Sequence, residues 1–268
     1  MHNYKKWVLA AVLCLGGASA MAAAPNTVLM ENMTSYEIRD AIAAGKTTVI
    51  VPSGGTEQNG PAMATGKHGF RALANAQTIA GRLGNALVAP MMPYVPDGSI
   101  DPPKGHMRYP GTFSIPEETY TTVLEYVARS LKQAGFRDIV FIGDHGTDQK
   151  PAEAVAAKLN AEWAATKVRV HPISGYYRGD LEGDRAEMMK MGIKKEEFGN
   201  HADVRDTSQM LAIDPTMVRM DRLEAGNGKN GVEGDPRHAS IAIGKMLIER
   251  TVSNTTNLIR KSIAETPR

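Results

Sequence analysis

Short apolar runs rich in β-branched residues recur along the chain, and each is followed by glycine or polar residues. Runs of this length, bounded by turn formers, are typical of buried β-strands. The predicted strands are Thr47–Pro52, Ala86–Pro90, Asp138–Gly143 and Lys167–His171.

Between these runs, apolar residues recur three and four positions apart, which is the spacing of one helix face. Alternation of strands and helices favours a parallel sheet covered by helices on both faces, with right-handed crossovers. We therefore predict an α/β fold, namely a three-layer α/β/α sandwich with a mainly parallel central sheet. The helices predicted between the strands are Ser35–Ala44, Gly69–Leu83, Pro116–Ala134 and Ala152–Trp163.

The last third of the chain is more polar, and its first two predicted helices are short enough to form a lid or a subunit contact. The pattern contains no internal repeat and no linker, so we expect one domain over residues 25–268. The helices predicted here are Asp184–Met191, Lys194–Phe198, Ala202–Leu211 and Arg237–Lys261.

The first 24 residues have the pattern of a secretory signal peptide. Lys5 and Lys6 precede the apolar run Trp7–Leu15, and small residues follow up to position 24. This order predicts cleavage near residues 20–24 and export to the periplasm. The alternative is an uncleaved anchor helix, although the apolar run is short for a membrane span.

Composition narrows the possible chemistry. Cys14 is the single cysteine and lies in the predicted signal, so the mature chain would have no disulfide, thiolate nucleophile or cysteine zinc site. The formal charge is +2, and removal of Lys5 and Lys6 brings it to about zero. Basic residues are scattered, which argues against nucleic-acid binding, and no further apolar run is long enough to span a membrane.

Side chains that suit metal or proton chemistry follow two predicted strands. Glu57 lies in the glycine-rich loop after the first strand, and His68 ends this loop. His145 and Asp148 follow the third strand directly. Ligands bind at the carboxyl ends of parallel strands, so we expect these residues to meet in one cleft. Carboxylate and imidazole suit zinc, manganese or iron. The alternatives are a solvated Glu57, a surface His68 and a helix cap at Asp148.

Two further segments carry candidate residues. His201 lies just before a predicted helix that contains Asp206, so a carboxylate could bind metal while His201 transfers protons. The alternative is an acidic first turn that complements the helix dipole. The long loop Met91–Ser114 contains His106, Arg108 and Tyr109, and its segment from residue 97 to 112 could close over a substrate. A structural or subunit-contact role is equally compatible with that loop. His171 and His238 are not expected to be ligands.

Five segments resemble, in the same order, motifs of the creatininase family of metal-dependent amidohydrolases. The family loop Pro-x-Gly-Ser-x-Glu-Gln-His-Gly-Pro-His-Leu-Pro-Leu-Gly-x-Asp is similar to Pro52-Ser-Gly-Gly-Thr-Glu-Gln-Asn-Gly-Pro-Ala-Met-Ala-Thr-Gly-Lys-His68. The resemblance covers essentially the whole mature length and implies the same fold class. The other similar segments are Tyr109-Pro-Gly-Thr112, Gly135–Asp148, His201–Ser208 and Gly231–Pro236.

The resemblance implies that Glu57 and His145 are metal ligands. His68 stands where the family has an Asp that bridges two ions, and Asn59 where it has a His that helps to bind the second ion. Acids also replace other family residues, with Asp148 at the place of an Asn and Asp206 at the place of a Glu. These replacements retain possible ligands, so we expect a remodelled site with one ion, and two ions as the alternative. The expected metal ligands are Glu57, His68, His145 and Asp206, for zinc before manganese or iron.

The expected activity is hydrolysis of a C–N amide bond in a small, possibly cyclic, substrate. The alternative is a catalytically inactive periplasmic protein that keeps the fold and binds a small molecule. The resemblance also implies a homo-hexamer. The expected catalytic residues are His201, Asp206 and Asp148, and the expected substrate-binding residues are His106, Arg108, Tyr109 and Asn59.

Overall fold

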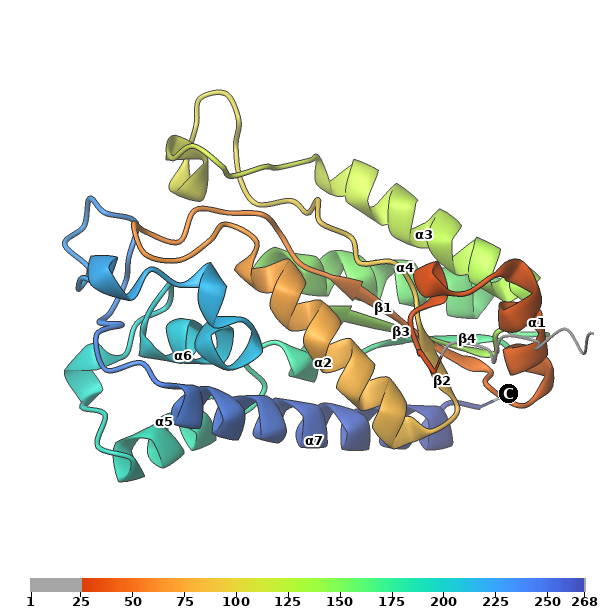
Figure 1. The fold of residues 1–268 in the computed structure, drawn as a ribbon. Helices are drawn as coiled ribbons and strands as arrows, with labels where there is room; N and C mark the ends of the chain where they lie inside the picture. The colour runs from red at the N-terminus through yellow and green to blue at the C-terminus, as the bar shows by residue number, and fades with distance from the viewer. Residues whose placement is uncertain (1–25, 268) are drawn as a thin grey trace, which may run out of the picture.

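The computed structural model describes residues 26–267, and the signal-peptide prediction lies outside these residues. Within the described chain, parallel strands form a sheet with the order β2-β1-β3-β4 (Figure 1). The predicted α/β fold with a mainly parallel sheet is confirmed. The strands are β1 (Thr48–Ser53), β2 (Ala86–Val88), β3 (Asp138–Gly143) and β4 (Arg169–Pro172).

The two central strands are paired over their full length. Thr48 lies opposite Asp138, and Ser53 lies opposite Gly143. Because the strands are parallel and end together, the loops that follow them leave the sheet side by side. The fold therefore brings the Glu57 loop next to Asp144 and His145, as the sequence predicts.

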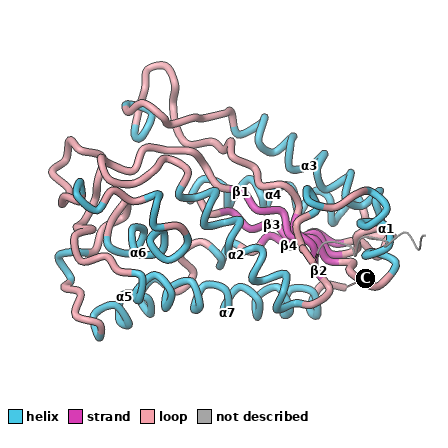
Figure 2. The backbone as a smooth tube through the Cα atoms, viewed as in Figure 1, coloured by secondary structure: helices cyan, strands magenta, loops and turns pink. Residues whose placement is uncertain are grey.

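Helices cover both faces of the sheet (Figure 2). Along β3, Ile139 and Phe141 pack in the core with α1, α3 and α4, whereas Val140 and Ile142 pack with α2 and α7. This alternation follows from the two-residue period of a strand. The helices are α1 (Ser35–Ala43), α2 (Lys67–Leu83), α3 (Glu117–Ala134), α4 (Gln149–Glu162), α5 (Leu181–Lys190), α6 (Val204–Ile213) and α7 (Ile241–Glu265).

Five of the predicted helix starts are shifted by two to four residues, those of α2 and α7 among them. The helix α2 begins two residues earlier than the apolar spacing predicts, so that Lys67 and His68 lie in its first turn. The helix α7 begins four residues later, because the Ser240 side chain accepts a hydrogen bond from the Ile243 N–H and caps it. The first of these differences places two polar side chains at the carboxyl end of the sheet.

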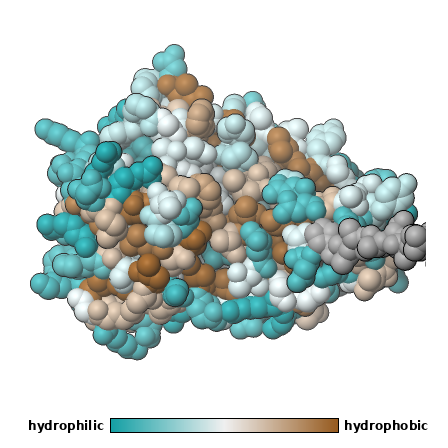
Figure 3. Space-filling model, in the orientation of Figure 1, coloured by the Kyte–Doolittle hydropathy of each residue, from teal (hydrophilic) through white to brown (hydrophobic). Residues whose placement is uncertain are grey.

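A separate apolar cluster lies at the end of the molecule that carries α5, α6 and the strand carboxyl ends (Figure 1). Its most buried members include Met188, Val204, Met210 and Leu247. On the face drawn in Figure 3, hydrophilic residues gather at this end of the surface. The cluster holds α6, and with it His201 and Asp206, against the rest of the domain.

The contact between α6 and α7 depends on a glycine. A Cβ atom on Gly244 would lie 1.9 Å from the carbonyl oxygen of Ser208, and both partners belong to helix backbones. The Ser208 hydroxyl also accepts a hydrogen bond from the Ser240 N–H at 3.1 Å. The backbones approach too closely here for any side chain.

We expect Gly244→Ala to lower the free energy of unfolding by about 1–3 kcal/mol, because the added methyl group forces the two helices apart. Urea unfolding followed by circular dichroism measures the change. The control is Gly81→Ala in α2, where a Cβ meets nothing within 4 Å. The free energy of unfolding of this control should rise by up to about 1 kcal/mol, because alanine has a higher helix propensity than glycine. Equal effects of the two substitutions would contradict the packing argument.

Candidate metal centre

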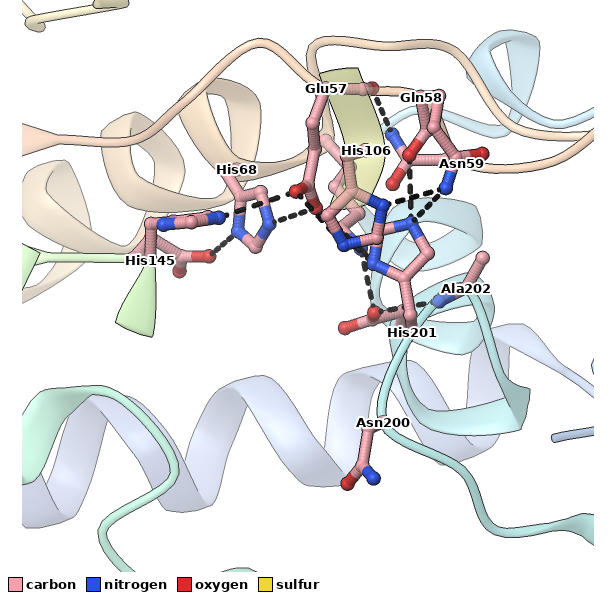
Figure 4. A network of polar contacts seen from close by, with 12 residues as sticks. Glu57, Gln58, Asn59, His68, His106, His145, Asn200, His201 and Ala202 are labelled. Atoms are coloured by element: carbon pink, nitrogen blue, oxygen red, sulfur yellow. Dashed lines mark hydrogen bonds and ion pairs between the residues drawn. The ribbon is translucent and has the colours of Figure 1, made fainter. Parts of the chain in front are cut away.

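Glu57 lies at the centre of a buried cluster of histidines (Figure 4). Its Oε1 is 2.7 Å from Nε2 of His68, and its Oε2 is 3.2 Å from Nε2 of His145. Burial opposes ionisation of this carboxylate, but the charges of Lys67 and His68 outweigh burial and lower its pKa. Glu57 is therefore an anion that is 1% exposed.

His68 is held in one orientation by a second acid. Its Nδ1 lies 2.7 Å from Oδ1 of Asp144, so the Nδ1–H donates to this carboxylate and Nε2 faces Glu57. A carboxylate behind a histidine is the usual arrangement for a metal ligand. Burial disfavours the charge of Asp144, but the Arg71 guanidinium and His68 lower its pKa to about 2.

His145 points at Glu57 from the other side. Its Nδ1 lies 2.7 Å from the Thr147 hydroxyl, and its Nε2 lies 3.4 Å from Oδ1 of Asp97. Burial opposes a charge on His145, yet Asp97 and Glu57 raise its pKa to about 10. This environment favours a cation between the imidazole and the two carboxylates.

Asp97 is a further candidate residue, which in the sequence is marked only as the start of a loop segment. Its side chain is 1% exposed, and neither carboxylate oxygen accepts a hydrogen bond within the described chain. A buried carboxylate is costly unless it is paired or binds a cation. The sequence signal for Asp97 is its place in a loop that is unusually long, since such loops often carry functional residues.

The donor set fits a divalent cation. One ligand atom from each of Glu57, His68 and His145 lies within 4.8 Å of the others. Two imidazoles and a carboxylate are a frequent zinc set, with room for water in the fourth position. The buried carboxylate of Asp97, 3.4 Å from Nε2 of His145, adds negative charge that such an ion requires.

A second group with metal-ligand spacing contains Glu57, His106 and His201. The Nε2–H of His201 donates to the Gln58 carbonyl at 2.7 Å, and its Nδ1 faces the Lys67 ammonium at 3.3 Å. Burial and Lys67 lower the pKa of His201 to about 3, so the ring is neutral. Both of its nitrogens are occupied, and the ring of His106 stacks on it at 4.1 Å.

The expected role of Asp206 as a metal ligand needs correction. Its Oδ2 accepts from Lys67 at 2.9 Å and from the Ala202 N–H at 3.1 Å, and its Oδ1 accepts from Arg71 at 2.8 Å. Two fixed cations therefore hold the carboxylate that the sequence predicts as a metal ligand. The sequence offered no periodic signal for Lys67 or Arg71, because their partners lie far away along the chain.

The expected catalytic role of Asp148 also needs correction. Asp148 is fully buried, and its Oδ2 accepts from the Ser53 hydroxyl at 2.9 Å. It occupies the N-cap position of α4, but its side chain forms no capping hydrogen bond there. Burial raises its pKa to about 6. Asp148 thus packs against β1 and acts on His145 only through its charge.

A polar cavity of about 170 Å³ lies beside the second group and is the candidate substrate pocket. His106, Arg108 and Tyr109, which the sequence predicts as substrate-binding residues, line it together with Gln58 and Glu233. Asn59 does not line it. The Asn59 side-chain amide donates to the carbonyls of Glu57 and Ala64 at 3.0 and 2.9 Å, and so braces the loop.

The two histidines that were not expected to be ligands bond elsewhere. His171 contacts Ser262 and Asp138, and His238 contacts Glu197. Neither belongs to the two groups around Glu57.

Fold and site together define an α/β protein with a candidate metal centre at the carboxyl ends of parallel strands. A family model, Creatininase, described as creatinine amidohydrolase, matches residues 31–259. The chain therefore belongs to the creatininase family, and it is a creatininase-like hydrolase. This confirms the resemblance found in the sequence.

The similar proteins are hydrolases with different substrates. The mycofactocin precursor peptide peptidase of Mycolicibacterium smegmatis is 26% identical over 237 residues, which cover 80% of this chain and 84% of that protein. The creatinine amidohydrolase of Pseudomonas putida is 27% identical over 204 residues, covering 74% and 76%. A solved structure titled creatininase Mn has a TM-score of 0.72 at 23% identity, covering 88% of this chain and 98% of that one. A variant creatininase titled Zn-Zn type has the same TM-score and coverage at 22% identity.

Asp148 makes stability depend on pH. As pH rises from about 4 to 6, the unfolded chain ionises this group first, near its ordinary pKa of 3.8, while the folded protein ionises it only near 6. The stability that the protonated native form contributes is therefore lost over this range. Each pKa unit corresponds to about 1.4 kcal/mol, so the loss amounts to about 3 kcal/mol.

We expect Asp148→Asn to remove this loss. The free energy of unfolding of the variant, relative to that of the unmodified protein, should therefore be about 3 kcal/mol higher at pH 7 than at pH 4. Urea unfolding at both pH values, with a chelator present, gives the difference. Asp221→Asn removes an exposed carboxylate and is the matched control. A stability difference that is the same at both pH values would refute the assignment.

We expect Asp97→Asn to weaken zinc binding by about 10–100-fold, because it removes the buried charge beside His145 without changing the size of the side chain. Competition with a fluorescent zinc chelator measures the affinity. Asp101→Asn, in the exposed part of the same loop, should leave it unchanged. Unaltered affinity in the Asp97 variant would show that this carboxylate takes no part in metal binding.

Proposed function

We propose that this hydrolase cleaves a C–N amide bond in a small substrate with the help of one divalent metal ion, zinc before manganese or iron. The observation that carries the proposal is the convergence of Glu57, His68 and His145, with both imidazole Nε2 atoms directed at one carboxylate. The relatives named as an amidohydrolase and a peptidase support hydrolysis of a C–N bond.

Glu57, His68 and His145 would hold the ion, with Asp97 beside them. When bound, the ion would lower the pKa of a coordinated water and polarise the substrate carbonyl. Asp144 and Thr147 keep the two rings oriented through their Nδ1 atoms. These contacts preorganise the donors before any substrate enters.

His106 is better placed than His201 to transfer a proton to the leaving nitrogen. The Gln58 amide donates to Nδ1 of His106 at 2.8 Å, which leaves the proton on Nε2, 3.7 Å from Oε2 of Glu57. His106 also lines the cavity, whereas both nitrogens of His201 are occupied. We therefore assign proton transfer to His106, and the positioning of its ring to His201.

The pocket favours a compact polar substrate. A volume of about 170 Å³ is below the range of about 300–1,000 Å³ that is usual for drug-sized ligands. The Arg108 guanidinium offers hydrogen-bond donors to the cavity, whereas the Tyr109 hydroxyl already donates to the Lys229 carbonyl at 3.1 Å. A small linear or cyclic amide fits this description better than a long peptide chain.

Export to the periplasm is a further proposal, which rests on the pattern of the first 24 residues. Among residues 26–267, no helix is both long and apolar enough to cross a membrane. Fractionation of cells and N-terminal sequencing of the exported protein test the proposal. Assembly into a homo-oligomer remains a prediction, which light scattering tests.

We expect Glu57→Gln and His145→Ala each to lose the bound zinc and to lower amide hydrolysis by at least about 100-fold, since the ion supplies several kcal/mol of transition-state stabilisation. Zinc is counted by mass spectrometry of the purified protein. Hydrolysis is followed as release of amine or ammonia from creatinine and a panel of small linear amides. His238→Ala removes an exposed histidine and is the control.

Metal-free protein recovered from zinc-supplemented buffer would end the proposal of a metal-dependent enzyme. The remaining interpretation would then be a binding protein with this fold. Zinc that stays bound in both variants would place the ion elsewhere in the chain.

A further inference from the structure

Lys67 is a buried charge at the centre of the site. Its side chain is 1% exposed, and it lies in the first turn of α2, immediately before His68. Its Nζ is 2.9 Å from Oδ2 of Asp206, 3.2 Å from Oε1 of Glu57 and 3.3 Å from Nδ1 of His201. The ammonium group therefore faces three acceptors from two distant parts of the chain, the loop after β1 and the segment that begins α6.

These three acceptors are atoms that a divalent metal also accepts as ligands, namely two carboxylate oxygens and one imidazole nitrogen. Here they are spaced for the longer hydrogen bonds of an ammonium group, so a metal ion would have to draw them closer together. The position is separate from the one between His68 and His145, but Glu57 serves both. Its Oε1 faces Lys67 and His68, and its Oε2 faces His145.

We infer that the Lys67 ammonium occupies a second cation position of this site, and that the protein consequently binds a single metal ion per chain. The inference rests on the proposed metal-dependent function. It deepens that function by giving the number of ions and the residue that sets it.

The ammonium group and a metal ion cannot occupy this position at the same time. A metal ion would have to approach the same oxygen and nitrogen atoms to about 2.0–2.2 Å, within the volume that Nζ now fills. An ion and the ammonium group would also repel each other strongly in a buried place. One of the two must therefore be absent.

Lys67 has no free donor for substrate. An ammonium group carries three N–H donors, and three acceptors within 3.3 Å match them. Lys67 therefore compensates the charges of Glu57 and Asp206 and holds the His201 ring in its orientation. Lys67 is a positioning residue and not a proton donor to the reaction.

Removal of the lysine would leave space and uncompensated negative charge at this position. Asp206 would keep Arg71 on Oδ1 and the Ala202 N–H on Oδ2, but it would lose the ammonium charge. Glu57 and His201 would each lose the same neighbour. A second metal ion would restore the missing positive charge.

The experiment counts zinc in the full-length protein and in three variants after equilibration with zinc and removal of the free metal. The unmodified protein should hold one ion per chain, and Lys67→Ala should hold two. Lys67→Met removes the charge but fills the volume, so it should hold one ion. Lys195→Ala removes an exposed lysine and is the control, with one ion.

Two results would overturn the inference while leaving the proposed function intact. The first is two ions per chain in the unmodified protein, and the second is a single ion in folded Lys67→Ala. A protein that binds no zinc at all would instead refute the proposed function.

A second measurement decides the matter if the alanine variant fails to fold. Anomalous scattering at the zinc edge, from crystals of the unmodified protein, should give a peak among Glu57, His68 and His145. It should give none among Glu57, Asp206 and His201. A peak at the latter position would overturn the inference directly.

Discussion

The buried negative charge of Glu57 is the constraint around which the site is arranged. A carboxylate that is 1% exposed must be compensated, since an isolated buried charge costs far more than the stability of a domain can tolerate. The structure supplies Lys67 at 3.2 Å and the Nε2 atoms of His68 and His145 at 2.7 and 3.2 Å. Each of these partners is in turn fixed by another residue.

The surrounding charges form one connected network. Arg71 joins Asp144 to Asp206, and these two acids hold His68 and Lys67 respectively. Removing one member would leave another buried charge without its partner, which is usually more destabilising than the pair is stabilising. The same acidic and basic residues that could act in catalysis therefore also stabilise the fold at the carboxyl end of the sheet.

The departures from the family motifs become intelligible as a set. His68 and Asn59 stand where the motifs have residues for two ions, and Lys67 brings its own charge to the same region. Asn59 has become a brace for the loop through its two hydrogen bonds to carbonyl groups. All three residues are consistent with a site that binds one exchangeable metal ion and has the Lys67 ammonium group as its second cation.

The sequence by itself determined the sheet, the order of its strands along the chain and the two strand ends that carry Glu57 and His145. These follow from local signals, because apolar period and turn residues act over a few positions. Tertiary structure alone decided which acids remain free for a cation and which are neutralised. Lys67 and Asp206 lie 139 positions apart, and Asp97 reaches His145 from a loop without periodicity. No local pattern records such pairs, since they arise only when the packed helices and loops bring their charges within a few ångströms.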